Sequence, residues 1–209
     1  MSRPGARMFC LAILLVLLAA GTAPLGAEPV MVALGDSITA GFGVLPDEAY
    51  PAWLEARLRR EGYDYRVVNA GVSGDTTAAA LRRVDWVLRS QPSIVIVALG
   101  ANDGLRHQSV TAMRDNLVAI VRRLRAAGAA VLLTGMHVPT NYGPDYARAF
   151  AGVFGEVART TGVALMPFLL DGVAGHPRLN QPDGIHPTAE GQRIIADRLW
   201  PHLKPLLHK

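Results

Sequence analysis

The chain has 209 residues, of which half are hydrophobic and 18% are charged. This composition suits one well-buried domain and excludes a disordered or fibrous protein. The formal net charge is +4, but Arg3 and Arg7 lie in an N-terminal leader that contains no acidic residue. Removing these two arginines from the 21 basic residues leaves 19 against 17 acidic ones, without a long basic run that could follow a phosphate backbone. We therefore expect no nucleic-acid partner.

The leader, residues 1–27, has the pattern of a secretory signal peptide. Its two arginines precede the uncharged apolar run Met8–Ala20, which is too short to span the hydrocarbon core of a membrane as a helix. Ala27 then provides a small residue for cleavage. An uncleaved membrane anchor is the alternative. We expect cleavage, so that residues 28–209 form one exported domain, periplasmic or secreted, without a stable membrane anchor.

The only cysteine, Cys10, lies in this leader. The mature chain therefore has no disulfide, no thiolate nucleophile and no cysteine-ligated metal. No tight pair such as His-x-x-x-His occurs either, so we expect no metal site and no cofactor.

Apolar runs and helical spacing alternate along the rest of the chain. In chain order they predict the strand Pro29–Leu34, the helix Tyr50–Arg60, the strand Tyr65–Val68, the helix Thr76–Arg89, the strand Ser93–Leu99, the helix Val110–Ala126, the strand Ala129–Thr134, the helix Asp145–Arg159, the strand Val163–Met166 and the helix Thr188–Leu203. The run Ser93–Leu99 is apolar almost throughout, as is typical of a central parallel strand with helices on both faces. The alternation predicts one α/β domain with a parallel sheet.

Three longer loops, Leu99–Ser109, Gly135–Pro144 and Pro167–Pro187, each follow a predicted strand. Open α/β sheets bind ligands at the carboxyl ends of their strands. We therefore expect a functional site among these loops.

The first strand runs into Gly35-Asp36-Ser37. A serine just past a strand end points its hydroxyl into the crevice, where nearby backbone N–H groups can hold an oxyanion. Ser37 is therefore a candidate nucleophile. A serine that caps a helix is the alternative interpretation.

The last loop ends in Asp183-Gly184-Ile185-His186-Pro187. A tight turn at Gly184 lets the Asp183 carboxylate accept a hydrogen bond from one imidazole nitrogen of His186 and leaves the other nitrogen free. A hydrolytic serine needs such a base oriented by an acid. The alternative is a capped helix start with a solvated histidine.

Two further residues follow strands two and three. The Asn102 side chain can donate to a developing oxyanion, and Gly71 can bring its backbone N–H close to a substrate because it has no Cβ. Local capping by Asn102 and an ordinary turn at Gly71 are the alternatives.

Together, the blocks at Gly35–Ser37, Gly71, Gly100–Asp103 and Asp183–Pro187 resemble the SGNH hydrolases, also called the GDSL family. The stretches Gly100–Arg106, Pro139–Gly143, Met166–Phe168 and Asp183–Pro187 are similar to its exported bacterial branch of acyl-CoA thioesterases, arylesterases and lysophospholipases. The resemblance implies a three-layer α/β/α sandwich, flavodoxin-like, with a five-stranded parallel sheet in the order 2-1-3-4-5.

The resemblance also implies residue roles. Ser37 is the nucleophile, His186 the base and Asp183 the residue that orients it. The backbone N–H groups of Ser37 and Gly71 and the side chain of Asn102 form the oxyanion hole. The implied function is a serine hydrolase that cleaves carboxylic esters and thioesters of apolar acyl groups through an acyl-enzyme.

We expect the small-molecule substrate to be held by apolar loop residues. The candidates are Gly104, Leu105, Val138, Pro139 and Tyr142, with Met166, Phe168 and Leu169 nearby. The family implies that the segment 104–109 closes over the acyl chain. The alternative for Met166 and Phe168 is that their side chains only cover the sheet.

Several alternatives remain open. Ser73, flanked by Gly71 and Gly74, is the rival nucleophile, although we expect it to cap the next helix. His107 and His137 have a surface or substrate-lining role. A carbohydrate acetylesterase of the same superfamily and a non-catalytic flavin-binding module are the other functions considered. A monomer is expected, because no heptad pattern occurs.

Overall fold

The computed structural model describes residues 28–208. The predicted signal peptide at 1–27, with Cys10 and the cleavage position, lies outside the described residues. Within 28–208, no helix is long and apolar enough to cross a membrane.

Five parallel strands form one sheet in the order β2-β1-β3-β4-β5, as the resemblance implied. The strands are β1 Val30–Gly35, β2 Arg66–Gly71, β3 Ile94–Ala98, β4 Ala130–Thr134 and β5 Ala164–Met166. All five were predicted from the sequence. Strands β1 and β3 are buried along their whole length, which explains why their sequences are apolar without alternation.

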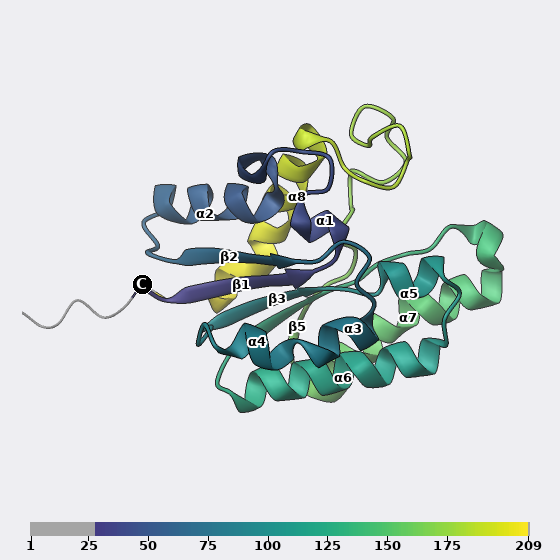
Figure 1. Ribbon diagram of the computed structural model, residues 1–209, viewed down its shortest axis with the longest axis horizontal. Helices are drawn as coiled ribbons and strands as arrows, with labels where there is room; N and C mark the ends of the chain where they lie inside the picture. The colour runs from purple at the N-terminus through teal and green to yellow at the C-terminus, as the bar shows by residue number, and fades with distance from the viewer. Residues whose placement is uncertain (1–27, 209) are drawn as a thin grey trace, which may run out of the picture.

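Helices cover both faces of this sheet. They are α1 Ser37–Ala40, α2 Tyr50–Arg60, α3 Thr77–Arg82, α4 Val84–Leu88, α5 Ala101–Leu105, α6 Val110–Ala126, α7 Pro144–Thr161 and α8 Ala189–Leu203, with the 3₁₀ turns η1 Pro46–Glu48, η2 Thr140–Tyr142 and η3 Lys204–Leu206. In Figure 1, α2 and α8 lie on one side of the sheet and α3, α4, α6 and α7 on the other. This is the predicted three-layer α/β/α sandwich.

The helix predicted at Thr76–Arg89 is in fact two helices, α3 and α4, which meet at Arg83. The Arg83 guanidinium donates to Asp75 Oδ2 at 2.6 Å, to Ala70 O at 2.9 Å and to Gly35 O at 3.0 Å. These bonds hold Arg83 at the carboxyl ends of β1 and β2, so the helix breaks there. The prediction of one continuous helix was therefore wrong.

The sheet register brings the ends of three strands together. Gly35, the last residue of β1, pairs with Gly71 of β2 and with Ala98 of β3. The segments that follow these strands carry three of the four sequence blocks, so these blocks start from one edge of the sheet.

Candidate active site

Ser37 is the first residue of α1, the short helix that follows β1 directly. Asp36 caps this helix, because its Oδ1 accepts a hydrogen bond from the Ile38 N–H at 3.1 Å. A Cβ at Gly35 would overlap the Thr39 side chain, so only glycine permits so tight a passage from strand to helix. The Ser37 N–H donates to no group in the described chain and lies at the open N-terminus of α1.

Asp183 and His186 form a compact turn in the loop before α8. Asp183 Oδ1 accepts from the N–H groups of Ile185 at 2.9 Å and His186 at 3.0 Å, and Oδ2 lies 2.7 Å from His186 Nδ1. Gly184 has a φ of +70°, which favours glycine at this turn. The hydrogen bonds from His186 and Ile185 lower the pKa of Asp183 to about 2, so the carboxylate stays charged.

The other imidazole nitrogen, His186 Nε2, lies 2.9 Å from Ser37 Oγ. The fold thus joins Ser37, His186 and Asp183 in one chain of hydrogen bonds. The Phe42 ring covers part of the imidazole, with ring centroids 4.6 Å apart. Because Asp183 accepts at Nδ1, Nε2 is free to accept the serine proton.

Asp36, which sequence reasoning gave no separate role, is 2% exposed. Burial raises its pKa to about 6, and the Ile38 N–H and the nearby His186 oppose that rise. Its second oxygen, Oδ2, has no hydrogen-bond partner within the described chain. The site therefore contains a second perturbed carboxyl beside the serine.

Asn102 lies in the first turn of α5, at the carboxyl end of β3. Its side chain makes no hydrogen bond to any other group of residues 28–208, so both its amide hydrogens are available. Its neighbour Asp103 is buried and accepts from the Thr77 N–H at 2.8 Å and the Thr77 hydroxyl at 2.6 Å. These bonds hold α5 against α3.

Gly71 lies at the predicted edge, but its N–H already donates to Asn69 Oδ1 at 2.9 Å. A Cβ there would overlap the Ala40 backbone, so this glycine serves the close packing of β2 against α1. The structure therefore does not leave the Gly71 N–H open to an oxyanion.

Gly74, three residues later, is a candidate that sequence reasoning missed. Its N–H donates to nothing in the part of the chain that the structure describes, and its carbonyl accepts from Arg106 Nη2 at 3.1 Å. Arg106 follows α5 directly, so this contact ties Gly74 to the helix that carries Asn102. The only signal in the sequence that could have indicated this candidate is the glycine itself, between Ser73 and Asp75.

Ser73 itself is exposed, and Thr76 rather than Ser73 caps α3 by accepting from the Ala79 N–H at 3.3 Å. His186 is bonded to Ser37 and not to Ser73. The expected capping role of Ser73 is therefore wrong.

A hollow of about 540 Å³ reaches α1 at Ile38, the residue after Ser37. Of the predicted substrate-binding residues, Leu105, Val138 and Pro139 line it, and so does Phe168. His137, expected to lie at the surface or to line the substrate site, lines it as well. Further lining residues that sequence reasoning missed are Ile38, Ala101, Met136, Leu170, Ala174 and Ile185. The lining is largely apolar, which suits an acyl chain.

The other predicted lining residues lie elsewhere. Gly104 is buried, and a Cβ on it would overlap Val138 and lie 2.8 Å from the Phe150 ring. Gly104 therefore allows α5 to pack closely. The Tyr142 hydroxyl donates to Leu105 O at 3.2 Å, Met166 lines a neighbouring hollow, and Leu169 is in the core.

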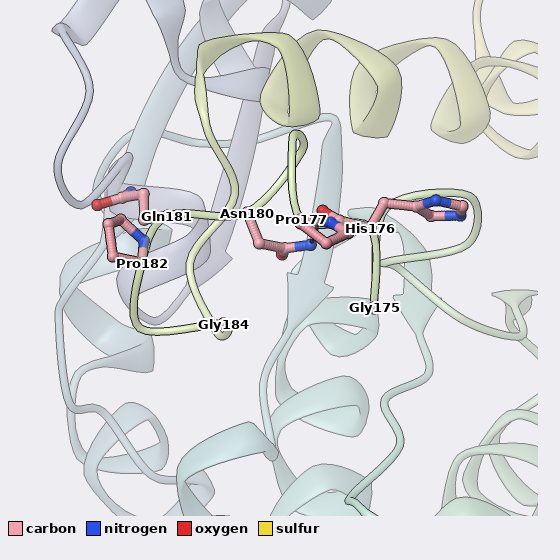
Figure 2. Close-up of a pocket in the computed structure, with 7 residues that line it drawn as sticks. All are labelled: Gly175, His176, Pro177, Asn180, Gln181, Pro182 and Gly184. Atoms are coloured by element: carbon pink, nitrogen blue, oxygen red, sulfur yellow. Dashed lines mark hydrogen bonds between the residues drawn. The ribbon is translucent and has the colours of Figure 1, made fainter.

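A second hollow of about 370 Å³ adjoins the first one (Figure 2). Its lining includes Gly175, Asn180 and Gly184, which the two hollows share. The loop that carries Asp183 and His186 therefore faces both spaces.

His107 and His137 stack on aromatic rings, at 4.0 Å from the Tyr146 centroid and 4.2 Å from the Phe168 centroid. Among residues 28–208, no three His, Cys, Asp or Glu side chains group in a way that could hold a metal ion.

Comparison with known proteins gives relatives over most of the chain. Residues 33–194 match the model of the GDSL-like Lipase/Acylhydrolase family. The chain is 44% identical to Esterase TesA of Pseudomonas aeruginosa, covering 95% of this chain and 96% of that one. It is 37% identical to Thioesterase 1/protease 1/lysophospholipase L1 of Escherichia coli, covering 87% and 86%.

Among solved structures, a crystal structure of TesA matches with a TM-score of 0.83 and 45% identity, over 85% of this chain and 99% of that one. The matched range 33–194 includes all four sequence blocks, and Ser37, Asp183 and His186 lie within it. The chain belongs to the GDSL-like lipase/acylhydrolase family.

Proposed function

We propose that the chain hydrolyses carboxylic esters and thioesters of apolar acyl groups through an acyl-enzyme on Ser37. The observation that carries the proposal is the hydrogen-bond chain from Ser37 Oγ through His186 to Asp183. The names of the relatives, an esterase and a thioesterase/lysophospholipase, support the same reaction class.

The proposed reaction has two halves. As Ser37 Oγ attacks the acyl carbonyl carbon, His186 Nε2 takes the serine proton, and Asp183 stabilises the imidazolium. His186 then gives this proton to the departing alkoxide or thiolate as the C–O or C–S bond breaks. Water attacks the acyl-serine in the second half, with His186 again taking and returning a proton.

The oxyanion of each tetrahedral intermediate needs hydrogen-bond donors that are free before the substrate arrives. The Ser37 N–H and the Asn102 side-chain amide meet this condition. We assign the third donor to the Gly74 N–H, because the Gly71 N–H is bonded to Asn69 Oδ1.

The hollow lined by Leu105, Val138 and Phe168 is the proposed acyl site. Its volume of about 540 Å³ and its apolar lining favour medium or long acyl chains over acetyl groups. Acyl-CoA thioesters, lysophospholipids and aryl esters of fatty acids present such chains. This observation makes a carbohydrate acetylesterase the weaker candidate.

We also propose that the enzyme is exported after removal of residues 1–27 and acts as a monomer without a membrane anchor. The signal-peptide pattern of the leader supports export.

The direct test is Ser37→Ala, assayed on p-nitrophenyl octanoate, with Ser73→Ala as the matched control. We expect Ser37→Ala to lose hydrolysis while its circular dichroism stays that of the wild type, and Ser73→Ala to retain activity. A fluorophosphonate should add mass to Ser37 alone. Turnover by Ser37→Ala, or a yellow protein that is not labelled, would overturn the proposal.

A further inference from the structure

Ser37 and His186 come from opposite ends of the chain, on separate loops, and hydrolysis requires them to stay within hydrogen-bond distance. The side-chain bond between them is exposed to competition from water and substrate. Other hydrogen bonds, away from the reacting atoms, fix the two loops to each other.

Gln181 makes such contacts on both sides. Its backbone N–H donates to His186 O at 2.7 Å, and its carbonyl accepts from the Gly184 N–H at 2.9 Å. Its side-chain Nε2 donates to Phe42 O at 2.7 Å and to Pro187 O at 3.0 Å. Both side-chain partners are carbonyl oxygens, which only the amide nitrogen can serve.

Phe42 in turn is fastened to the nucleophile, because its N–H donates to Ser37 O at 3.0 Å. The bonds close a ring: Ser37 O to Phe42, Phe42 O to Gln181, Gln181 N–H to His186 O, and His186 Nε2 to Ser37 Oγ. Every link except the last is independent of the reacting atoms, so the links through Phe42 and Gln181 do not depend on the proton transfer.

The neighbouring residue Gly43 shows how closely the Gln181 side chain fits. Gly43 has a φ of +77°, and a Cβ on it would overlap the Gln181 amide. Figure 2 shows Gln181 on the side of its loop that faces the purple N-terminal ribbon, away from His176. The glutamine therefore fills the junction between the two loops.

We propose that Gln181 is a positioning residue that holds His186 and Phe42 in register with Ser37. The inference rests on the proposed function, since it assumes that Ser37 and His186 react together. Gln181 itself touches no reacting atom and acts through the two loops that it joins.

The test compares Gln181→Met and Gln181→Glu with Gln91→Met. Methionine keeps the length of the side chain and loses both donors. Glutamate keeps the shape but turns a carboxylate toward two carbonyl oxygens. Gln91 is an exposed glutamine before β3, at the opposite end of the sheet, and gives the matched control.

On p-nitrophenyl octanoate at pH 8 we expect kcat to fall on the order of ten- to hundredfold for Gln181→Met, because small misalignments of reacting groups cost that much. KM should stay within about twofold, since the acyl hollow is not lined by Gln181. The kcat of Gln181→Glu should fall further than that of Gln181→Met, and the kcat of Gln91→Met should match that of the wild type.

A residue that only fills space would give the opposite pattern, with methionine close to wild type and the loss confined to thermal stability. Rates are therefore normalised to folded protein from circular dichroism, and Gln181→Asn, whose amide is too short to reach Phe42 O, provides a second variant. The kcat of Gln181→Asn should also be lower than that of the wild type.

A kcat for folded Gln181→Met or Gln181→Asn within twofold of wild type would overturn the inference, as would an equal loss in Gln91→Met. Fluorophosphonate labelling separates this result from failure of the proposed function. Wild-type protein that is not labelled at Ser37 rejects the hydrolase mechanism, whereas normal labelling with unaffected variants rejects only the role of Gln181.

Discussion

Asp183 is kept in its charged form by the hydrogen bonds that its carboxylate accepts. Three hydrogen bonds from Ile185 and His186 hold its carboxylate and lower its pKa to about 2. Since this pKa is below that of the unfolded chain, the bonds stabilise the fold at pH values above about 4. That contribution is lost as the pH falls from about 4 toward 2.

Asp183→Asn should lower kcat on the order of 10²- to 10⁴-fold, because the amide no longer stabilises the imidazolium that forms on His186. KM for p-nitrophenyl octanoate should change little. Asp145→Asn, on an exposed aspartate at the start of α7, is the control. Equal activity of the two variants would contradict the role of Asp183.

Residue types and spacing made Ser37, Asp183, His186 and Asn102 candidates, because each belongs to a short block that follows a strand or precedes a helix. The structure brings three of them, Ser37, His186 and Asp183, into hydrogen-bond contact. The oxyanion glycine could not be chosen in this way. Whether the N–H of Gly71 or of Gly74 is free depends on where the Asn69 side chain points, and a sequence does not show that.

At the scale of elements, every strand and long helix was predicted, since each has an apolar pattern of its own. The short helices α1 and α5 were not predicted as such, because four or five residues carry no helical period. The break between α3 and α4 comes from Arg83, whose partners on β1 and β2 are distant in sequence.

The segment after β5 separates two hollows. Phe168 lines both the proposed acyl hollow of about 540 Å³ and a neighbouring one of about 350 Å³ that includes Met166 and His202. Its ring stacks on His137, with 8° between the ring planes. Phe168 therefore lines both hollows, and we infer that its ring closes one end of the acyl site.

Phe168→Ala should join the two hollows and shift selectivity toward longer chains. We expect the ratio of kcat/KM for p-nitrophenyl palmitate to that for the octanoate to rise about tenfold, which corresponds to the burial of about two further methylenes at about 0.8 kcal/mol each. Pro167→Ala, on an exposed neighbour outside the acyl hollow, is the control. An unchanged ratio would show that Phe168 is not the end wall.

At the scale of the whole molecule, the site exists only when the two ends of the chain meet. Gln192 of α8 is fully buried, donates to Ile38 O at 2.9 Å and accepts from the Tyr50 N–H at 3.0 Å. The closing helix is thereby fixed to the helix that carries Ser37. Activity therefore requires the folded domain as a unit.

Burial of Asp36 makes the stability of the whole folded domain depend on pH. Its buried carboxyl has a pKa of about 6, whereas the unfolded chain returns it to water and to a pKa near 4. The folded state therefore binds more protons between about pH 4 and pH 6. The contribution of Asp36 to the free energy of unfolding is largest below pH 4 and declines as the pH rises through 6.

Asp36→Asn removes this titration and keeps an oxygen that accepts from the Ile38 N–H. A pKa difference of about two corresponds to about 3 kcal/mol. We expect the stability of the variant relative to wild type to improve by roughly that amount between pH 4 and pH 7.5. Urea denaturation at both pH values measures it, and Asp183 contributes equally to both proteins. A difference that does not vary with pH would mean that Asp36 is not neutral in the folded enzyme at low pH.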